Sequence, residues 1–387
     1  MLPLLAQTDP AQLERIKPRM QQFVDQQVVS GAVTLVARRG KIVEFDAVGM
    51  ADIAAGQAMR KDTIFQIMSM TKPFTAVAVM MLAEEGKLAL REPIATYLPE
   101  FKGQRVASTT GPDMGRAATP ARPVTVRDLM SHTSGMFDAP PAEIKDYMQQ
   151  MNLPLADLVQ VFARQPLLFQ PGTQWSYSSP GIDILGRIVE VCSGEKYEDF
   201  VAHRILQPLG MKDSFFYPDA ARLSRIAMVY EGDSGKLVPS SGKILGGDPA
   251  RHRQGAKYPA PGWGLHSTAE DLFHFHQMLL NGGIYGGHRL LSPFSIHLMT
   301  EVYTPGMHPS GWVGGSGYGL GWEVLTEPYG ELAGFWAGTY GHGGAFGTQG
   351  WIDPKHELIR IMLIQRSDGN DTIRNTFMTM SAAAVVN

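Results

Sequence analysis

Apolar residues recur every three or four positions in some segments of the chain and alternate or run together in others. The first pattern predicts helices over residues 11–28, 124–130, 181–192, 197–205, 268–280 and 371–386. We expect Pro18 to kink the first of these helices. The second pattern predicts strands at residues 31–39, 41–48, 319–325, 347–352 and 358–365. The Arg39-Gly40 pair between the first two strands predicts an antiparallel hairpin.

Strands therefore lie near both ends of the chain, and helices lie in the middle. The simplest architecture is α/β (in the sense of α+β), with one antiparallel sheet, flanking helices and an inserted, mainly helical domain. Residues 1–62 and 266–387 would form the sheet domain, residues 63–265 the helical one, and the active site would lie at their interface. Residues 103–123 and 232–261 are rich in turn-forming residues and read as irregular segments.

One predicted helix carries the most informative residues, Ser69-Met70-Thr71-Lys72. In a helix, the Ser69 hydroxyl and the Lys72 amine would project from one face, one turn apart. Pro73 is tolerated only in a first turn, so the helix should begin near Ser69, and residues 74–83 are apolar enough to be buried. A lysine whose pKa is depressed by burial can take a proton from serine. The alternative for this window is a serine N-cap with Lys72 reaching the surface.

Composition and charge narrow the class of protein. The chain has 387 residues, 44% of them hydrophobic and 18% charged, which allows a large core. A net charge of −3 without a basic run argues against nucleic acid as a partner. Zinc-protease, P-loop and paired C-x-x-C motifs are missing, so we expect no metal and no cofactor.

The expected location is cytoplasmic. Cys192 is the only cysteine, so an intramolecular disulfide cannot form, and it lies in an apolar helical pattern typical of the core. Residues 1–7 lack a basic region and are too short for a signal peptide, and we find no segment long enough to span a membrane. A trimmed secreted or periplasmic form remains an alternative.

Acyl transfer by a serine–lysine pair also needs a group that protonates the leaving group and a second oxyanion donor, and two further segments could supply them. Tyr177, in residues 174–180, is a candidate general acid or base if nearby cations lower its pKa. Residues 340–348 hold five glycines or alanines, and an edge strand there would let the Ala345 N–H join the Ser69 N–H in an oxyanion hole. His342 would bind or orient the substrate. The alternative for Tyr177 is a loop tyrosine that only packs, and the alternative for residues 340–348 is a glycine-rich bulge before a strand.

The order and spacing of these three segments resemble the serine β-lactamase and penicillin-recognising superfamily. Residues 129–136, 171–178, 318–322 and 341–344 are similar to further segments of it, and the likeness runs from about residue 28 onward. The chain most resembles class C-like members, above all the family VIII carboxylesterases. The resemblance implies a β-lactamase/transpeptidase-like fold.

The resemblance also implies roles for individual residues. Ser69 would be the acylated nucleophile, Lys72 its base and Tyr177 the proton shuttle, with the oxyanion hole formed by the N–H groups of Ser69 and Ala345. The substrate-binding residues would be Ser179, His342, Gly343 and Gly344. Candidate pocket walls are Trp263, Trp312, Phe346, Tyr318 and the Phe137-Asp138 loop.

Two departures from the β-lactamase pattern favour esters over β-lactams. Ser179 stands where those enzymes carry asparagine, and His342 stands where they carry the lysine of K-T-G. Histidine is mostly neutral at pH 7, so the position loses its permanent cation for a substrate carboxylate. The chain also lacks the G-x-S-x-G pentapeptide of α/β-hydrolases.

We therefore predict a serine carboxylesterase that hydrolyses short- to medium-chain esters through an acyl-enzyme on Ser69, with transesterification when an alcohol accepts the acyl group. One alternative is a β-lactamase or D-amino-acid peptidase on the same site, and another is a penicillin-recognising protein that binds without turnover. The expected partner is a small-molecule ester. The natural substrate, the stereopreference and the oligomeric state stay open at this point.

Overall fold

The N-terminal hairpin forms as the apolar pattern predicts. Strand β1 (Gly31–Arg38) pairs antiparallel with β2 (Lys41–Asp52). Arg39 and Gly40 take φ angles of 51° and 74°, the left-handed pair of a two-residue turn whose twist matches that of the strands. The computed structural model describes residues 8–107, 117–240, 252, 255–307, 315–369 and 371–386.

The two ends of the chain meet in one sheet. Its order in the described residues is β12-β13-β14-β15-β16-β1-β2-β3, and every pair is antiparallel. Val33 of β1 lies opposite Leu363 of β16, so the N-terminal hairpin continues directly into the C-terminal strands. The other strands of the sheet are β12 (Ser316–Tyr318), β13 (Glu323–Leu325), β14 (Tyr340–Gly343), β15 (Gln349–Asp353), β16 (Leu358–Leu363) and β3 (Gln57–Ala58).

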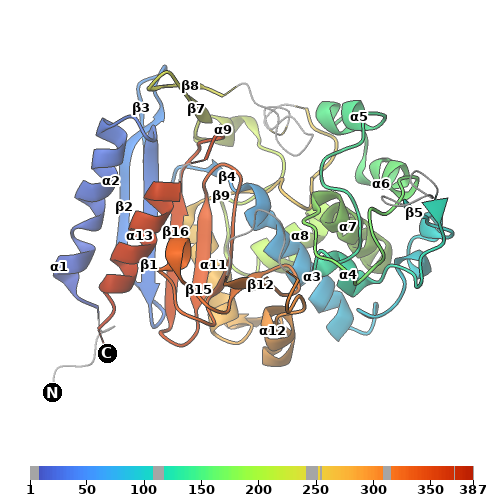
Figure 1. Cartoon of the computed structure of the whole chain (residues 1–387). Coiled ribbons are helices and arrows are strands. Elements are labelled where there is room, and N and C mark those ends of the chain that lie inside the picture. Colours follow the sequence, from blue (N-terminus) through green and yellow to red (C-terminus); the bar gives the residue numbers. More distant parts are fainter. Residues whose placement is uncertain are drawn as a thin grey trace.

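Helices cover both faces of this sheet (Figure 1). On one face, α2 (Ile16–Asp25) and α13 (Asp371–Ala383) pack on β1, β2 and β16 around Phe23 and Phe377. On the other face, α11 (Ala269–Leu280) packs on β1, β15 and β16. Its apolar layer continues into the core of the helical part of the molecule.

The middle of the chain is mainly helical. Its helix α3 (Lys72–Glu84) is buried on nearly all sides and packs against α7 (Ser179–Ser193) and α8 (Tyr197–Val201). The other helices within the described ranges are α1 (Pro10–Leu13), α4 (Val126–Met130), α5 (Lys145–Gln150), α6 (Leu155–Ala163), α9 (Ala220–Leu223) and α12 (Pro293–Thr300), with 3-10 turns at Met68–Thr71, Ile94–Thr96, Pro99–Phe101 and Gly330–Leu332 and a π-turn at Ala202–Leu206. Short two-stranded pairs are β4 (Phe65–Gln66) with β9 (His266–Ser267), β5 (Val106–Ala107) with β6 (Ala117–Ala118), β7 (Tyr230–Asp233) with β8 (Lys236–Pro239), and β10 (Ile284–Tyr285) with β11 (His288–Arg289).

Several details differ from the predictions, and the irregular segment predicted at residues 103–123 contains the β5–β6 pair. The predicted first helix is interrupted between α1 and α2. Pro18 lies in the first turn of α2, where the backbone N–H that proline lacks would have no partner within the helix. Pro18 therefore does not kink a continuous helix. Residues 232–261 are not irregular throughout, because they include the β7–β8 hairpin; residues 241–251 and 253–254 lie outside the described part. Residues 319–325 are not one strand. Gly321, at φ 83°, turns the chain between β12 and β13 against Ala76 of α3.

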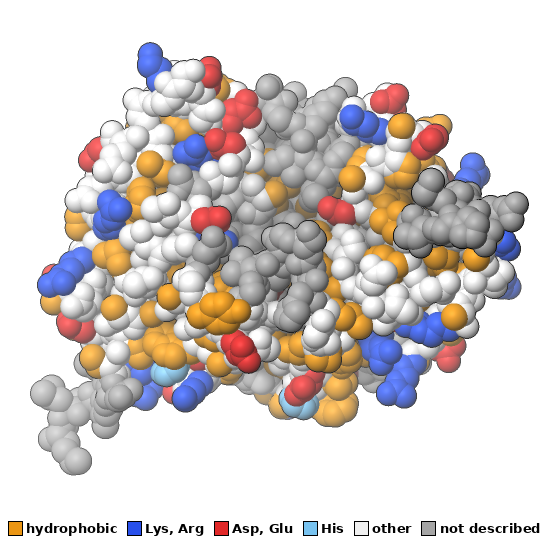
Figure 2. Space-filling view, viewed as in Figure 1, with side chains coloured by type: hydrophobic (Ala, Val, Ile, Leu, Met, Phe, Trp, Pro, Cys, Tyr) orange, Lys and Arg blue, Asp and Glu red, His pale blue; other side chains and the backbone are white. Residues whose placement is uncertain are grey.

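The predicted fold class is confirmed, and the boundaries given for two domains stay a prediction. In the described residues, no helix is both long and apolar enough to cross a membrane. On the face shown in Figure 2, basic and acidic side chains are interspersed and do not gather by sign.

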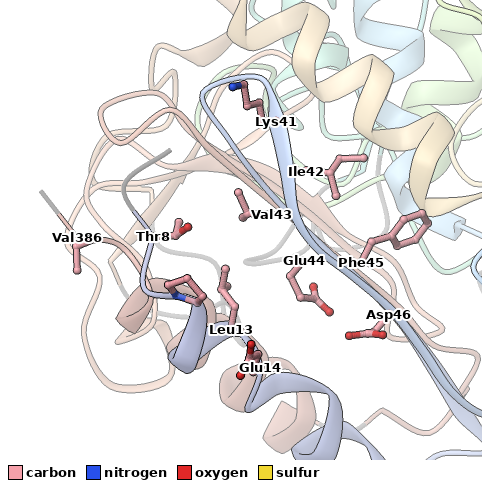
Figure 3. A pocket seen from close by; sticks show the side chains of 11 residues that line it. Thr8, Leu13, Glu14, Lys41, Ile42, Val43, Glu44, Phe45, Asp46 and Val386 are labelled. Atoms are coloured by element: carbon pink, nitrogen blue, oxygen red, sulfur yellow. The ribbon is translucent and has the colours of Figure 1, made fainter. Parts of the chain in front are cut away.

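An open groove of about 810 Å³ lies between β2 and the start of α1, close to Val386 (Figure 3). Glu44 of β2 is only 8% exposed there and accepts one hydrogen bond, from the Thr34 hydroxyl at 2.8 Å. Its second carboxyl oxygen, Oε2, is buried and has no hydrogen-bond partner in the described residues. Burial raises the pKa of Glu44 to about 7.

Candidate active site

Ser69 lies where the chain enters α3. The 3-10 turn Met68–Thr71 precedes the helix, and Pro73 occupies its first turn, as predicted. Met68, directly before Ser69, has φ 52° and is fully buried. A non-glycine residue in the left-handed region costs about 1–3 kcal/mol and is held there by its surroundings, a feature that gathers at functional sites.

Lys72 points into the protein and not to the surface. Its side chain has no exposed area, and Nζ donates to Ser69 Oγ (3.2 Å), Ser179 Oγ (3.2 Å) and the Gly262 carbonyl (2.9 Å). These three acceptors match the three donors of an ammonium group. Burial lowers the pKa of Lys72 to about 8, against the opposing effect of Asp138 and Asp183. The surface-lysine alternative is therefore wrong, and the role of Lys72 as the base for Ser69 stays a prediction.

Tyr177 completes a triangle with Ser69 and Lys72. Its hydroxyl is hydrogen-bonded to Ser69, and Lys72 Nζ lies 4.5 Å from the centre of its ring. Burial raises the pKa of Tyr177 above its ordinary value, more than the bond to Ser69 lowers it. The condition stated above for an acid–base role, a pKa lowered by nearby cations, is therefore not met. The raised pKa keeps the Tyr177 hydroxyl neutral, and its role as a proton donor stays a prediction.

The loop after β14, which contains Ala345, is tied to the segment that precedes Ser69. Ala345 lies in an exposed turn and not on the expected edge strand. Thr348 Oγ1 donates to the Ile67 carbonyl at 2.9 Å, which ties this turn to the segment leading into Ser69. A Cβ on Gly344 would lie 2.3 Å from Ile67 O, so only glycine permits the approach. Within the described residues, the Ala345 N–H has no hydrogen-bond acceptor.

His342 is held in one neutral form. Its Nδ1 lies 2.6 Å from the Gly343 carbonyl, and its Nε2 lies 3.0 Å from the Tyr318 hydroxyl. A carbonyl can only accept, so Nδ1 carries the proton and Nε2 accepts from Tyr318. Burial, with the nearby Lys72, lowers the pKa of His342 to about 3. Both ring nitrogens are already engaged, and the position provides no cation.

Ser179 begins α7 beside the catalytic pair. Its N–H donates to Asp138 Oδ1 at 2.9 Å, and its hydroxyl accepts from Lys72. Gly343, at the end of β14, and Gly344, after it, lie in the loop toward Ser69. The structure thus brings the predicted site residues together, while the substrate-binding roles of Ser179, His342, Gly343 and Gly344 stay predictions.

The predicted pocket walls are largely packing residues. Trp263, Phe346, Tyr318 and Phe137 are each no more than 3% exposed. Asp138 is partly exposed and faces Ser179. Trp312 lies outside the described residues. Among the residues that the structure describes, no group of three or more acidic, histidine or cysteine side chains could hold a metal ion.

Sequence reasoning missed residues that support the site through contacts between distant segments. His132 lies in the left-handed region (φ 58°), accepts from the Ser178 N–H at 3.2 Å and packs 4.5 Å from the Tyr177 ring. Asp183 binds the Gly262 N–H, and Gly262 in turn accepts from Lys72. The one available signal was Asp183 itself, an acidic residue between the apolar residues Ile182 and Ile184 of a predicted helix.

Comparisons with known proteins identify the family of the chain. The profile of the Beta-lactamase family matches residues 16–383. The chain belongs to the beta-lactamase family. Esterase EstB of Burkholderia gladioli is 30% identical over 352 residues, 84% of this chain and 82% of EstB. Penicillin-binding protein 4 of Amycolatopsis lactamdurans is 32% identical over 338 residues, 83% of this chain and 76% of the relative.

A solved structure shares the fold over nearly the whole chain. EstCE1, described as a hydrolase with promiscuous acyltransferase activity, superposes with a TM-score of 0.82 at 26% identity, covering 97% of this chain and 99% of its own. Proteins that resemble this chain thus include both an esterase and a penicillin-binding protein. The predicted resemblance is confirmed, and the choice between these activities depends on the site.

Proposed function

We propose that the chain is a serine carboxylesterase that hydrolyses short- to medium-chain esters through an acyl-enzyme on Ser69. The main support is the contact between Ser69 Oγ and the buried Lys72 Nζ at 3.2 Å, in a site where burial lowers the pKa of Lys72 to about 8. A base with a pKa near the working pH combines a useful deprotonated fraction with enough basicity to take the serine proton. The esterase among the relatives supports the same reading.

Acylation follows from the positions of three side chains. Lys72 takes the Ser69 proton as Oγ attacks the ester carbonyl carbon. The N–H groups of Ser69 and Ala345 stabilise the negative charge on the carbonyl oxygen. When the carbon–oxygen bond breaks, the leaving alkoxide takes a proton from the Tyr177 hydroxyl, and the protonated Lys72 restores that proton. Ser69 then carries the acyl group, and the alcohol leaves.

Deacylation uses the same groups with water in place of the alcohol. Water gives a proton to the Tyr177–Lys72 pair as it attacks the acyl carbon. Ser69 Oγ regains a proton as the carboxylic acid leaves, so the enzyme returns to its starting state. No step needs a metal or an organic cofactor.

The state of His342 favours a neutral ester over a β-lactam or a peptide that ends in a carboxylate. A lysine at this position would offer a permanent cation to the substrate carboxylate. Here the neutral His342 is engaged by Tyr318 and Gly343, so that attraction is missing at this position. The Ser179 hydroxyl likewise contacts Lys72, where an asparagine would offer an amide to the substrate.

A paired assay tests this function. Wild type and Ser69→Ala are compared on p-nitrophenyl acetate, p-nitrophenyl butyrate and nitrocefin. We expect ester cleavage by wild type that is lost in Ser69→Ala, with little cleavage of nitrocefin. Nitrocefin turnover that approaches the best ester rate would instead favour the β-lactamase alternative. Binding without turnover of any of the three would favour a penicillin-recognising binding protein.

Acyl transfer to an alcohol is a second candidate activity, favoured by the description of EstCE1. It would need only that an alcohol replace water at the acyl-enzyme. Product analysis with p-nitrophenyl butyrate and added 1-butanol tests it. Butyl butyrate formed by wild type and not by Ser69→Ala would support it, whereas butyrate alone would exclude transfer under these conditions.

A further inference from the structure

A buried carboxylate that takes no part in the proposed chemistry lies behind Lys72. Asp183, in the second turn of α7, has no exposed area. Its Oδ1 accepts from the Gly262 N–H at 2.9 Å, and its Oδ2 accepts from the Tyr258 hydroxyl at 2.6 Å. A carboxylate out of contact with water is stable only when such donors compensate it, so these contacts hold the 258–262 segment against α7.

The same segment carries the carbonyl that holds Lys72. The Gly262 carbonyl accepts from Lys72 Nζ at 2.9 Å, and the preceding Pro261 carbonyl accepts from Thr75 Oγ1 at 2.7 Å. One side of the Gly262 peptide therefore faces Asp183, and the other faces the catalytic lysine. A Cβ on Gly262 would lie 3.3 Å from Asp183 Oδ1, so the peptide is packed directly on the carboxylate.

The geometry points to Asp183 as a positioning residue for Lys72: it fixes the Gly262 carbonyl that accepts from the ammonium, and it supplies a buried negative charge facing it. This inference rests on the proposed function at Ser69. The charged and titratable groups that act on Asp183, or that it acts on, are Lys72 of α3, Tyr197 of α8, Tyr258, and Asp138 of the loop before α5. Lys72 is the only cation among these, so the effect of the Asp183 charge falls on the catalytic base.

The two contributions can be separated with two variants. Asp183→Asn keeps an acceptor for the Gly262 N–H, and its amide can donate to the Tyr258 oxygen, so it removes the charge and leaves the contacts. The negative charge opposes the lowering of the Lys72 pKa, and its loss should lower that pKa further. We expect the acid limb of the pH profile of kcat/KM to move about one unit lower. Asp183→Ala removes the contacts as well, and we expect kcat to fall at least tenfold with little change in KM.

Asp271 provides a matched control. It is also buried, accepts from the Asp213 N–H (2.8 Å) and the Ser214 hydroxyl (2.7 Å), and is not among the groups that act on Lys72. Asp271→Asn should leave the pH profile unmoved. Titration of Ser69 with a fluorophosphonate gives the active fraction of every variant, so that partial unfolding is not counted as slower turnover. Should both Asp183 variants fail to fold, Tyr258→Phe removes one donor and should move the limb in the same direction by a smaller amount.

The labelling rate of Ser69 by the fluorophosphonate, followed against pH, provides a readout that does not need ester turnover. Labelling of wild type without ester hydrolysis would contradict only the proposed function. Absence of labelling in wild type would contradict both. An acid limb and a kcat per labelled Ser69 that stay within twofold of wild type in folded Asp183→Asn and Asp183→Ala would overturn the positioning role alone.

Discussion

Replacing Gly344 with alanine tests the proposed oxyanion hole without touching a side chain of the catalytic triangle. The new Cβ would lie 2.1 Å from Thr348 Oγ1 and 2.3 Å from the Ile67 carbonyl oxygen. Ordinary contact begins at 3.4 Å, so the turn must move by about 1.3 Å from the first atom and 1.1 Å from the second. Neither neighbour yields easily, because Thr348 is fully buried and Ile67 contributes backbone.

A shift of about 1 Å would carry the Ala345 N–H, the next residue, out of hydrogen-bond range of an oxyanion. Loss of one such donor costs about 10²–10³ in kcat, or roughly 3–4 kcal/mol of transition-state stabilisation. We expect kcat for p-nitrophenyl butyrate to fall by this factor, with a smaller change in KM, measured per Ser69 titrated with a fluorophosphonate.

A glycine far from Ser69 provides the control for this variant. Gly286, in the β10–β11 turn, also has a positive φ (56°), and a Cβ there would meet nothing within 4 Å. Gly286→Ala should cost about 1 kcal/mol of stability through backbone strain and leave kcat unchanged. If folded Gly344→Ala keeps kcat within about threefold of wild type, the Ala345 N–H is not an oxyanion donor and the reasoning is refuted.

Three further outcomes follow from the titratable groups. Lys72, with a pKa of about 8, is deprotonated in about one eleventh of molecules at pH 7 and in about ten elevenths at pH 9, so kcat/KM should rise about tenfold over this range. A flat pH profile of kcat/KM for p-nitrophenyl acetate would exclude Lys72 as the base. Tyr177→Phe removes the proposed proton donor to the leaving group and should lower kcat about 10²-fold or more, less for the good leaving group p-nitrophenolate than for ethanol from ethyl butyrate; equal losses for the two esters would exclude this role. The folded-state pKa of Glu44 is raised from 4.5 to about 7, so the unfolded chain loses this proton first and stability falls as pH rises from about 4.5 to 7. Glu44→Gln should therefore stabilise the fold by up to about 3 kcal/mol at pH 8 and little at pH 4.5, measured by urea unfolding. An equal effect at both pH values would contradict the raised pKa of Glu44.

Local signals predicted much of the scaffold. Pro73 placed the start of the Ser69 helix, because proline fits only a first turn. Thr125 and Thr268 cap α4 and α11 with their hydroxyls, as expected of residues that precede an apolar helical pattern. Where such a local rule decides the backbone, sequence alone was sufficient.

Long-range contacts set the remaining features and have no local signal. The turn at Gly321 forms against α3, more than two hundred positions earlier, so alternation within residues 319–325 could not reveal it. The Gly262 carbonyl beside Lys72 is a backbone group, and any residue type carries one. The pKa of Tyr177 depends on burial, which outweighs its hydrogen bond to Ser69 and which sequence does not report. The order of the motifs identified the candidate side chains, whereas packing sets their pKa values and hydrogen-bond partners.

The most direct test of the account is to locate the acyl group itself. Wild type is mixed with p-nitrophenyl butyrate, quenched in acid within the first turnovers, digested and analysed by mass spectrometry. The account predicts a butyryl group on the peptide that contains Ser69, formed in the burst phase and missing in Ser69→Ala. A butyryl group on another residue, or ester hydrolysis that persists in Ser69→Ala, would contradict it.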